Sequence, residues 1–142
     1  MHITEATPPM RPEIIALLQS QQLPVEDLPS QLSDFFVAQD DGKLIGLIGM
    51  ELYGEYGLLR SMVVHPDFRN KQIAADLVQT LEQRATAAGI KALYLLTETA
   101  AIYFNKKGFS TIQREEVPDV VKASSEFSHV CPVSATVMVK QF

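Results

Sequence analysis

Cysteine is nearly absent from this sequence, which has one, Cys131, in 142 residues. A single cysteine excludes an internal disulfide and a zinc site built on cysteines. No apolar stretch approaches the roughly 20 residues that cross a bilayer. Residues 1–6 also lack a cationic segment followed by an apolar run, so we expect no signal peptide, no membrane partner and a cytoplasmic protein.

Positive charge is scarce as well. The chain has 12 Lys and Arg against 17 Asp and Glu, a net charge of −5. An acidic chain without a basic face is a poor partner for nucleic acid, so we expect none. A hydrophobic content of 46% is ordinary for a globular protein, and 142 residues suit one core, so residues 1–142 are expected to form a single domain.

The pattern of apolar residues and turn signals predicts a mixture of helices and strands. Asp40-Asp41-Gly42 predicts a hairpin, Pro12 suits the first position of a helix, and Gly89 suits a helix end. Antiparallel strands come first, and a strand–helix–strand crossover follows. The expected strands are residues 2–6, 35–39, 43–52, 58–64, 90–96, 109–114 and 135–140. One helix is expected to start at Pro12, and four more are expected over residues 26–33, 72–88, 99–107 and 118–121.

Residues 61–75 are the most informative segment. A β-branched strand end is followed by His65-Pro66, by the cations Arg69 and Lys71, and by a helix whose apolar residues recur every three or four positions. Unpaired backbone N–H groups and the positive end of the helix dipole meet at such a helix start, which favours a phosphorylated ligand. An ordinary strand-to-helix connection with solvated cations is the alternative.

Two blocks of this sequence resemble the GNAT (GCN5-related) N-acetyltransferase superfamily. Pro66-x-x-Arg69-x-x-Gln72-x-Ala74 resembles its acetyl-coenzyme A loop, and residues 101–109, ending in Lys107-Gly108-Phe109, resemble its late helix. The resemblance implies an α/β fold with a central mixed twisted sheet and helices on both faces. Further similarity to the small N-acetyltransferases linked to arsenic resistance rests on residues 58–61, 94–97, 126–127 and 131–135.

The resemblance also implies acetyl-CoA as cosubstrate, with no metal. The backbone of a strand would pair with the pantetheine arm, and the loop would hold the diphosphate. Thr97 would contact the pantetheine arm, and the alternative for this residue is a helix cap. Gln72 replaces the expected loop glycine, and Phe104 stands where many members have a tyrosine that protonates the leaving thiolate. The implied cofactor-binding residues are Met62, Val63, Val64, Arg69, Asn70, Lys71, Gln72, Ile73, Ala74, Ala75, Thr97 and Phe104.

The acceptor site is less defined by the sequence. Leu58 stands where many members have a glutamate base, so the strand-end carboxylates Glu51 and Glu98 are the candidate bases, acting directly or through water. Strict strand alternation places Leu58, Arg60, Met62 and Val64 on one face. Arg60 is therefore predicted to bind a carboxylate or an arsenic oxyacid group of the substrate, with an ion pair to a neighbouring glutamate as the alternative.

These observations predict an N-acetyltransferase that transfers an acetyl group to the amine of a small, amino-acid-like molecule. No nucleophile with an adjacent base is evident, so direct attack in a ternary complex is expected. Two alternatives stay open: a non-catalytic acetyl-CoA-binding sensor, and an acetyltransferase that acts on a protein amine. We expect a monomer or a homodimer whose partner is a small-molecule amine.

Overall fold

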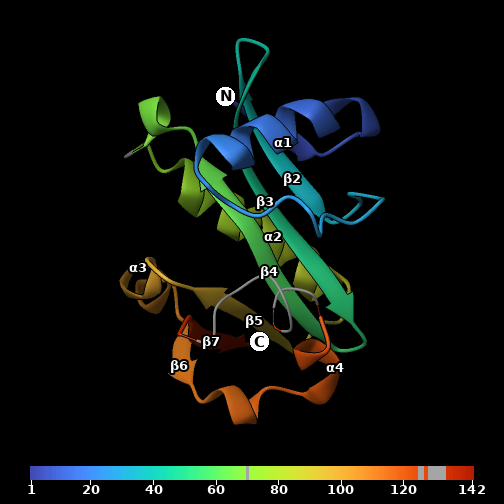
Figure 1. Ribbon diagram of the computed structural model, residues 1–142, viewed down its shortest axis with the longest axis vertical. Coiled ribbons are helices and arrows are strands. Elements are labelled where there is room, and N and C mark those ends of the chain that lie inside the picture. The colour runs from blue at the N-terminus through green and yellow to red at the C-terminus, as the bar shows by residue number, and fades with distance from the viewer. Residues whose placement is uncertain (70, 125–126, 128–133) are drawn as a thin grey trace. The chain divides into compact units, whose positions relative to one another are not determined.

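Seven strands form one mixed sheet in the order β1-β2-β3-β4-β5-β7-β6 (Figure 1). The computed structural model describes residues 1–69, 71–124, 127 and 134–142. The expected mixed α/β sheet is confirmed. The strands are β1 (His2–Glu5), β2 (Phe35–Asp40), β3 (Lys43–Tyr53), β4 (Tyr56–Val64), β5 (Ala92–Thr97), β6 (Ser110–Ile112) and β7 (Thr136–Gln141), and the helices are α1 (Arg11–Ser20), α2 (Ile73–Ala87), α3 (Ala101–Lys106) and α4 (Asp119–Lys122), with 3₁₀ turns η1 (Pro8–Met10), η2 (Pro66–Phe68) and η3 (Arg114–Glu116).

The chain divides into two compact units. Unit 1 consists of Met1–Met50 and Ser61–Arg84, and unit 2 consists of Glu51–Arg60 and Ala85–Phe142. Each unit has its own cluster of buried apolar side chains.

In unit 1, helices cover both faces of the sheet (Figure 1). Ile14, Leu17 and Leu18 of α1 pack with Val37 of β2 in one buried cluster. On the opposite face, a Cβ at Gly46 would lie 3.1 Å from Leu77 of α2 and 3.4 Å from Ala38. Val37 and Ala38 are adjacent strand residues, which point to opposite faces. The helices α1 and α2 therefore bury opposite faces of β2 and β3, as the apolar periodicity of both helices predicts.

The hairpin between β2 and β3 is the local feature that the sequence predicts best. Asp41 and Gly42 form a two-residue loop in which both residues have positive φ, 50° and 77°. This backbone matches the twist of paired strands, and glycine adopts it without a steric penalty.

The helix expected over residues 26–33 is not formed. Pro29 lies inside this segment and has no N–H group for a helical hydrogen bond. The carbonyl oxygens of Leu28 and Pro29 instead accept hydrogen bonds from the guanidinium of Arg11, and that to Pro29 is 2.7 Å long. Leu28 and Leu32 are buried against α1. Apolar contact with a helix distant in the sequence therefore replaces local helix formation.

In unit 2, β5 is the central strand. It pairs with β7 over its whole length, from Ala92 to Thr97. Its parallel pairing with β4, within the described residues of this unit, covers only Tyr56–Leu58. One face of these strands packs against α4 and against Phe127. The cluster consists of Leu58, Ala92, Tyr94, Val117, Val121, Phe127, Val137 and Val139, with Tyr53, Tyr56, Leu96 and Ile112 at its border.

Strict alternation does not hold along the whole of β4. Ser61 has φ 58°, in the left-handed region, and interrupts the extended backbone between Arg60 and Met62. Alternation of side chains requires an extended backbone at every residue. The expectation that Leu58, Arg60, Met62 and Val64 share one face of the strand is therefore wrong, because the left-handed backbone at Ser61 breaks the alternation within β4.

Candidate active site

The two cations of the predicted phosphate loop lie on the surface of unit 1. Arg69 is exposed, and its Nη2 donates a hydrogen bond of 2.9 Å to Oε1 of Gln21. Lys71 is also exposed, with its ammonium 5.4 Å from the centre of the Phe68 ring. Lys43 approaches the same ring at 5.9 Å. Phe68 thus holds two ammonium groups beside the start of α2 through cation–π contacts.

Gln72 ends the loop in a conformation that favours glycine. Its φ is 63°, and its carbonyl oxygen accepts the N–H of Asp76 at 3.0 Å. Ile73 is buried, while Ala74 and Ala75 are half-buried. Gln72 therefore has a left-handed backbone, which suits the glycine expected at this position, but its Cβ limits how closely a ligand can approach that backbone. Asn70 lies outside the described residues.

The strand before this loop has one buried and two half-buried residues. Val63 is buried in the cluster of unit 1, whereas Met62 and Val64 are half-buried. His65 follows the strand, and its Nδ1 accepts the backbone N–H of Asp67 at 3.1 Å. His65 is thus a turn residue, and the strand end leads directly into the loop.

In unit 2, Thr97 ends β5 and also caps the turn before α3. Its Oγ1 accepts the backbone N–H groups of Ala100 at 2.9 Å and of Thr99 at 3.4 Å. Thr97 thus stabilises the turn before the helix but is not its N-cap, since Ala100 holds that position without a side-chain hydrogen bond. Glu98 follows immediately and is exposed to solvent.

Phe104 and Tyr103 occupy different environments on α3. Phe104 is buried, and its ring packs edge-on against Phe109 at 5.4 Å. The Tyr103 hydroxyl is buried and makes no hydrogen bond within the described part of the chain. Burial raises the pKa of Tyr103 above its usual value, so this hydroxyl stays protonated at neutral pH. Phe104, at the position where many family members have a tyrosine, is thus a core residue.

Glu51 and Arg60, to which the sequence assigns separate roles, form an ion pair. Nη1 of Arg60 donates to Oε2 of Glu51. The pair is asymmetric, because the Arg60 side chain is 2% exposed and that of Glu51 is 20% exposed. The alternative for Arg60, an ion pair with a neighbouring glutamate, is therefore formed.

Tyr53 completes this cluster and was not identified from the sequence. It follows Glu51 by two residues and therefore lies on the same face of β3. Its hydroxyl donates to Oε1 of Glu51. Burial, and then the hydrogen bond to Glu51, raise the pKa of Tyr53 well above its usual value. The i, i+2 spacing of Glu51 and Tyr53 is the sequence signal that points to this contact.

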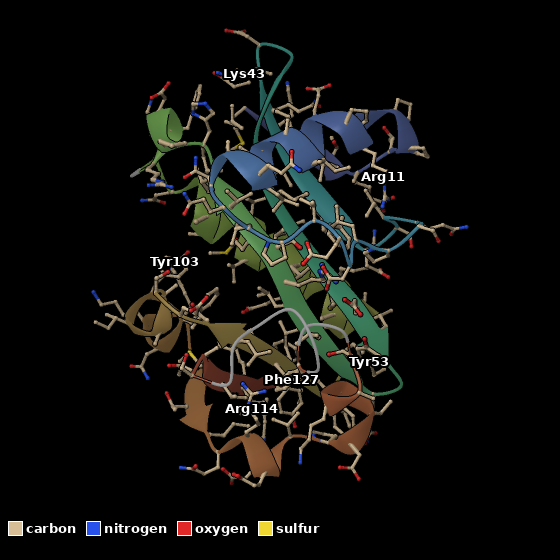
Figure 2. All side chains as sticks on the ribbon, in the orientation of Figure 1. Arg11, Lys43, Tyr53, Tyr103, Arg114 and Phe127 are labelled. Atoms are coloured by element: carbon tan, nitrogen blue, oxygen red, sulfur yellow. The ribbon has the colours of Figure 1, made fainter. Side chains whose placement is uncertain are left out.

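Ser124, just after α4, extends the cluster. Its hydroxyl is buried and hydrogen-bonds the Tyr53 hydroxyl. The same oxygen accepts the backbone N–H of Phe127 at 3.4 Å. Figure 2 shows Tyr53 and Phe127 among the side chains of unit 2. A chain of hydrogen bonds therefore runs from the segment after α4 through Tyr53 to the ion pair.

The described residues contain no group of three His, Cys, Asp or Glu side chains placed to hold a metal ion. None of the helices in the described ranges has the length and hydropathy needed to cross a membrane.

Comparison with known families identifies the chain. The family model of the acetyltransferase (GNAT) domain matches residues 31–111, more than half of the sequence. The chain belongs to the GNAT acetyltransferase family. The match includes β2 to α3, and so contains every predicted site residue.

Curated relatives of this GNAT chain include longer proteins. The amino-acid acetyltransferase of Pasteurella multocida is 26% identical over 113 residues, which are 75% of this chain and 26% of that protein. The chain thus spans about a quarter of the length of the amino-acid acetyltransferases it matches. An uncharacterized N-acetyltransferase of Chlorobaculum tepidum is 31% identical over 98 residues, 68% of this chain and 63% of that one.

Solved structures share the fold of this GNAT chain. N-acetylglutamate synthase from Neisseria gonorrhoeae, complexed with coenzyme A and N-acetyl-glutamate, superimposes with a TM-score of 0.84 at 21% identity, over 99% of this chain and 34% of that one. A Mycobacterium tuberculosis protein in complex with CoA and NLQ gives a TM-score of 0.82 at 20% identity, over 100% and 99% of the two chains. At these identities the likeness establishes the fold.

Proposed function

We propose that this chain is a single-domain N-acetyltransferase that moves an acetyl group from acetyl-CoA to the amine of a small, amino-acid-like acceptor. The match to the GNAT domain model carries this proposal. It is supported by the amino-acid acetyltransferases among the relatives and by the coenzyme A in the similar structures. The cytoplasmic location and the monomeric or homodimeric state stay predictions from the sequence.

The coenzyme site is proposed on the strand–loop–helix segment. The 15-residue helix α2 starts directly after two exposed cations, so its N–H groups and dipole favour a diphosphate. Bound acetyl-CoA supplies the acetyl group in activated form, as a thioester. We propose that the backbone of Met62, Val63 and Val64 pairs with the pantetheine arm. The remaining contacts are proposed for Arg69, Asn70, Lys71, Gln72, Ile73, Ala74, Ala75, Thr97 and Phe104.

The acceptor's amine must lose a proton during direct attack. Glu51 accepts hydrogen bonds from Tyr53 and Arg60, one on each oxygen, and a carboxylate oxygen has two acceptor sites, whereas Glu98 is exposed. We therefore propose Glu51 and Glu98 as the candidate bases, directly or through water, and Arg60 as the residue that binds the acceptor's acid group. A guanidinium binds a carboxylate and an arsenic oxyacid group through the same planar fork.

The test is release of coenzyme A thiol from acetyl-CoA with a panel of acceptors. The panel contains amino acids, their arsenic oxyacid analogues, and peptides with a free N-terminus. We expect turnover with at least one acid-bearing small amine and none with peptides. No turnover with any acceptor would contradict the proposal.

A second candidate is a sensor that binds acetyl-CoA without turnover. It is favoured by the buried Phe104, which has no hydroxyl at the position of the family tyrosine. Tight binding of acetyl-CoA, measured by calorimetry, together with a silent panel would establish the sensor. Turnover preferentially on peptides would indicate an enzyme that acts on a protein amine.

A further inference from the structure

Two lysines from different segments of unit 1 meet at one aromatic ring. Lys43 begins β3 at the β2–β3 hairpin (Figure 2), and Lys71 lies in the loop before α2. The ammonium of Lys43 is 5.9 Å from the centre of the Phe68 ring, and that of Lys71 is 5.4 Å from it. Both lysines are exposed to solvent, so a ligand reaches them without entering a pocket. The fold therefore gathers two accessible positive charges at one place on the surface.

The Phe68 ring is held in place by the residues before it. The N–H of Phe68 donates to the carbonyl oxygen of His65 at 2.9 Å, and the His65 ring packs edge-on against Phe68 at 5.8 Å. The N–H of His65 donates in turn to the carbonyl oxygen of Ile45 on β3, at 2.7 Å. The strand that carries Lys43 is thus tied to the loop, and Phe68 meets both lysines before any ligand binds.

Neither ammonium group forms an ion pair within the part of the chain that the structure describes. The carboxylates there pair with Arg60, Arg84 and Lys91, and with neither of the two lysines. Acidic side chains nevertheless outnumber basic ones in the sequence, 17 to 12. Two ammonium groups at one ring repel each other, and an anion that contacts both removes this repulsion. The pair of Lys43 and Lys71 is therefore suited to an anionic ligand.

The phosphates of acetyl-CoA differ in charge. Each phosphate of the diphosphate is a diester with a single negative charge, whereas the 3′-phosphate of the ribose is a monoester that carries about −1.5 to −2 at pH 7. The backbone N–H groups proposed at the start of α2 serve the diphosphate. Two ammonium groups on flexible four-carbon chains match the charge of the monoester instead, because both can turn toward one phosphate.

We propose that Lys43 and Lys71, gathered by Phe68, bind the 3′-phosphate of acetyl-CoA. This inference rests on the coenzyme site of the proposed function and adds Lys43 to it. Phe68 is a positioning residue, which keeps both ammonium groups beside the site before the coenzyme arrives. Lys43 therefore gives the protein a preference for acetyl-CoA over its 3′-dephospho form.

The test measures the Kd of acetyl-CoA and of 3′-dephospho-acetyl-CoA by calorimetry, without an acceptor. We expect the wild type to bind acetyl-CoA about tenfold more tightly, the effect of two exposed charge contacts. Lys43→Met keeps an unbranched apolar chain and removes the charge. It should raise the Kd of acetyl-CoA about fivefold and that of the 3′-dephospho form less than about twofold. Lys43→Arg keeps the charge and should retain the preference.

Two further variants make the test specific. Lys91→Met is the matched control, because Lys91 is an exposed lysine of unit 2 and its loss changes the net charge equally. It should leave the ratio of the two Kd values unchanged. Phe68→Leu removes the ring and neither charge, so it should lower this ratio while both forms still bind. Thermal unfolding verifies that each variant is folded, and if Phe68→Leu does not fold, Lys43→Met carries the test.

The outcomes separate this inference from the proposed function. A wild type that binds neither form overturns the proposed coenzyme site and this inference with it. A wild type that binds both forms equally overturns only the 3′-phosphate site. An equal loss of affinity for both forms in Lys43→Met also overturns it, because it assigns Lys43 to the diphosphate. A change in Lys91→Met as large as that in Lys43→Met does so too, since net charge alone then explains the effect.

Discussion

The N–H of Asp76 closes the first turn of α2 on the carbonyl oxygen of Gln72, at 3.0 Å, although the backbone of Gln72 is left-handed. A residue with a Cβ is strained in this conformation by about 1–2 kcal/mol. The carbonyl of Gln72 thus takes part in the first turn of the helix while its backbone adopts a conformation that a side chain disfavours.

Gln72→Gly is therefore expected to tighten the binding of acetyl-CoA. The change removes a Cβ that keeps the phosphate oxygens away from the loop backbone, so the Kd should fall by about threefold to tenfold, or about 0.7–1.4 kcal/mol. Gln22→Gly is the matched control, since Gln22 also has a positive φ, 60°, but follows α1. Calorimetry should find its Kd unchanged. Equal Kd values for both variants and the wild type would mean that the loop already accommodates Gln72.

Removing the charge of Glu51 is expected to destabilise the fold strongly. Glu51→Gln removes the charge of a carboxylate that pairs with the buried guanidinium of Arg60, which costs about 3 kcal/mol. Glu55→Gln removes the carboxylate of an exposed pair, Glu55–Lys91 at 3.3 Å, and should cost less than about 1 kcal/mol. Urea unfolding measures both changes. Losses of similar size would show that the buried pair contributes no more than a surface pair.

Stability is expected to fall at alkaline pH. The pKa values of Tyr53, Tyr94 and Tyr103 are raised in the folded protein, mainly by burial. Above about pH 10, the unfolded chain loses tyrosine protons that the folded chain keeps, so the free energy of unfolding decreases as pH rises. Urea unfolding between about pH 8 and 11 should show this fall, and Tyr53→Phe should make it shallower. If the free energy of unfolding falls with pH equally steeply in that variant, Tyr53 does not contribute to the loss of stability.

Thr97 is expected to serve both the fold and the coenzyme. Thr97→Val removes the oxygen that accepts the N–H of Ala100, which should lower the free energy of unfolding by about 1 kcal/mol. Because Thr97 is also proposed to contact the pantetheine arm, the same change should weaken acetyl-CoA binding. Thr97→Ser keeps the hydroxyl and should retain both properties. A Kd unaffected by valine would leave Thr97 with its role in the turn before α3 alone.

The features that the sequence predicts well depend on neighbouring residues. Asp41-Gly42 specifies its hairpin turn, and Gly89, with φ 79°, ends α2 where the sequence predicts. The segment from the end of β4 into α2 was predicted from its apolar spacing and its two cations. Each of these signals acts over a few residues, so the sequence by itself determines the order of elements and the family resemblance.

Only the tertiary structure decided how Glu51, Tyr53 and Arg60 are combined. The sequence offers Glu51 as a base and Arg60 as a recognition residue, and their pairing depends on two strands brought together by folding. Ser61 is left-handed in spite of a β-branched neighbourhood, and residues 26–33 stay non-helical because Arg11 and α1 bind them. For the ion pair and for residues 26–33 the physical reason is the same: a buried charge or a backbone carbonyl must find a partner, and these partners lie 9 and 17–18 residues away in the sequence.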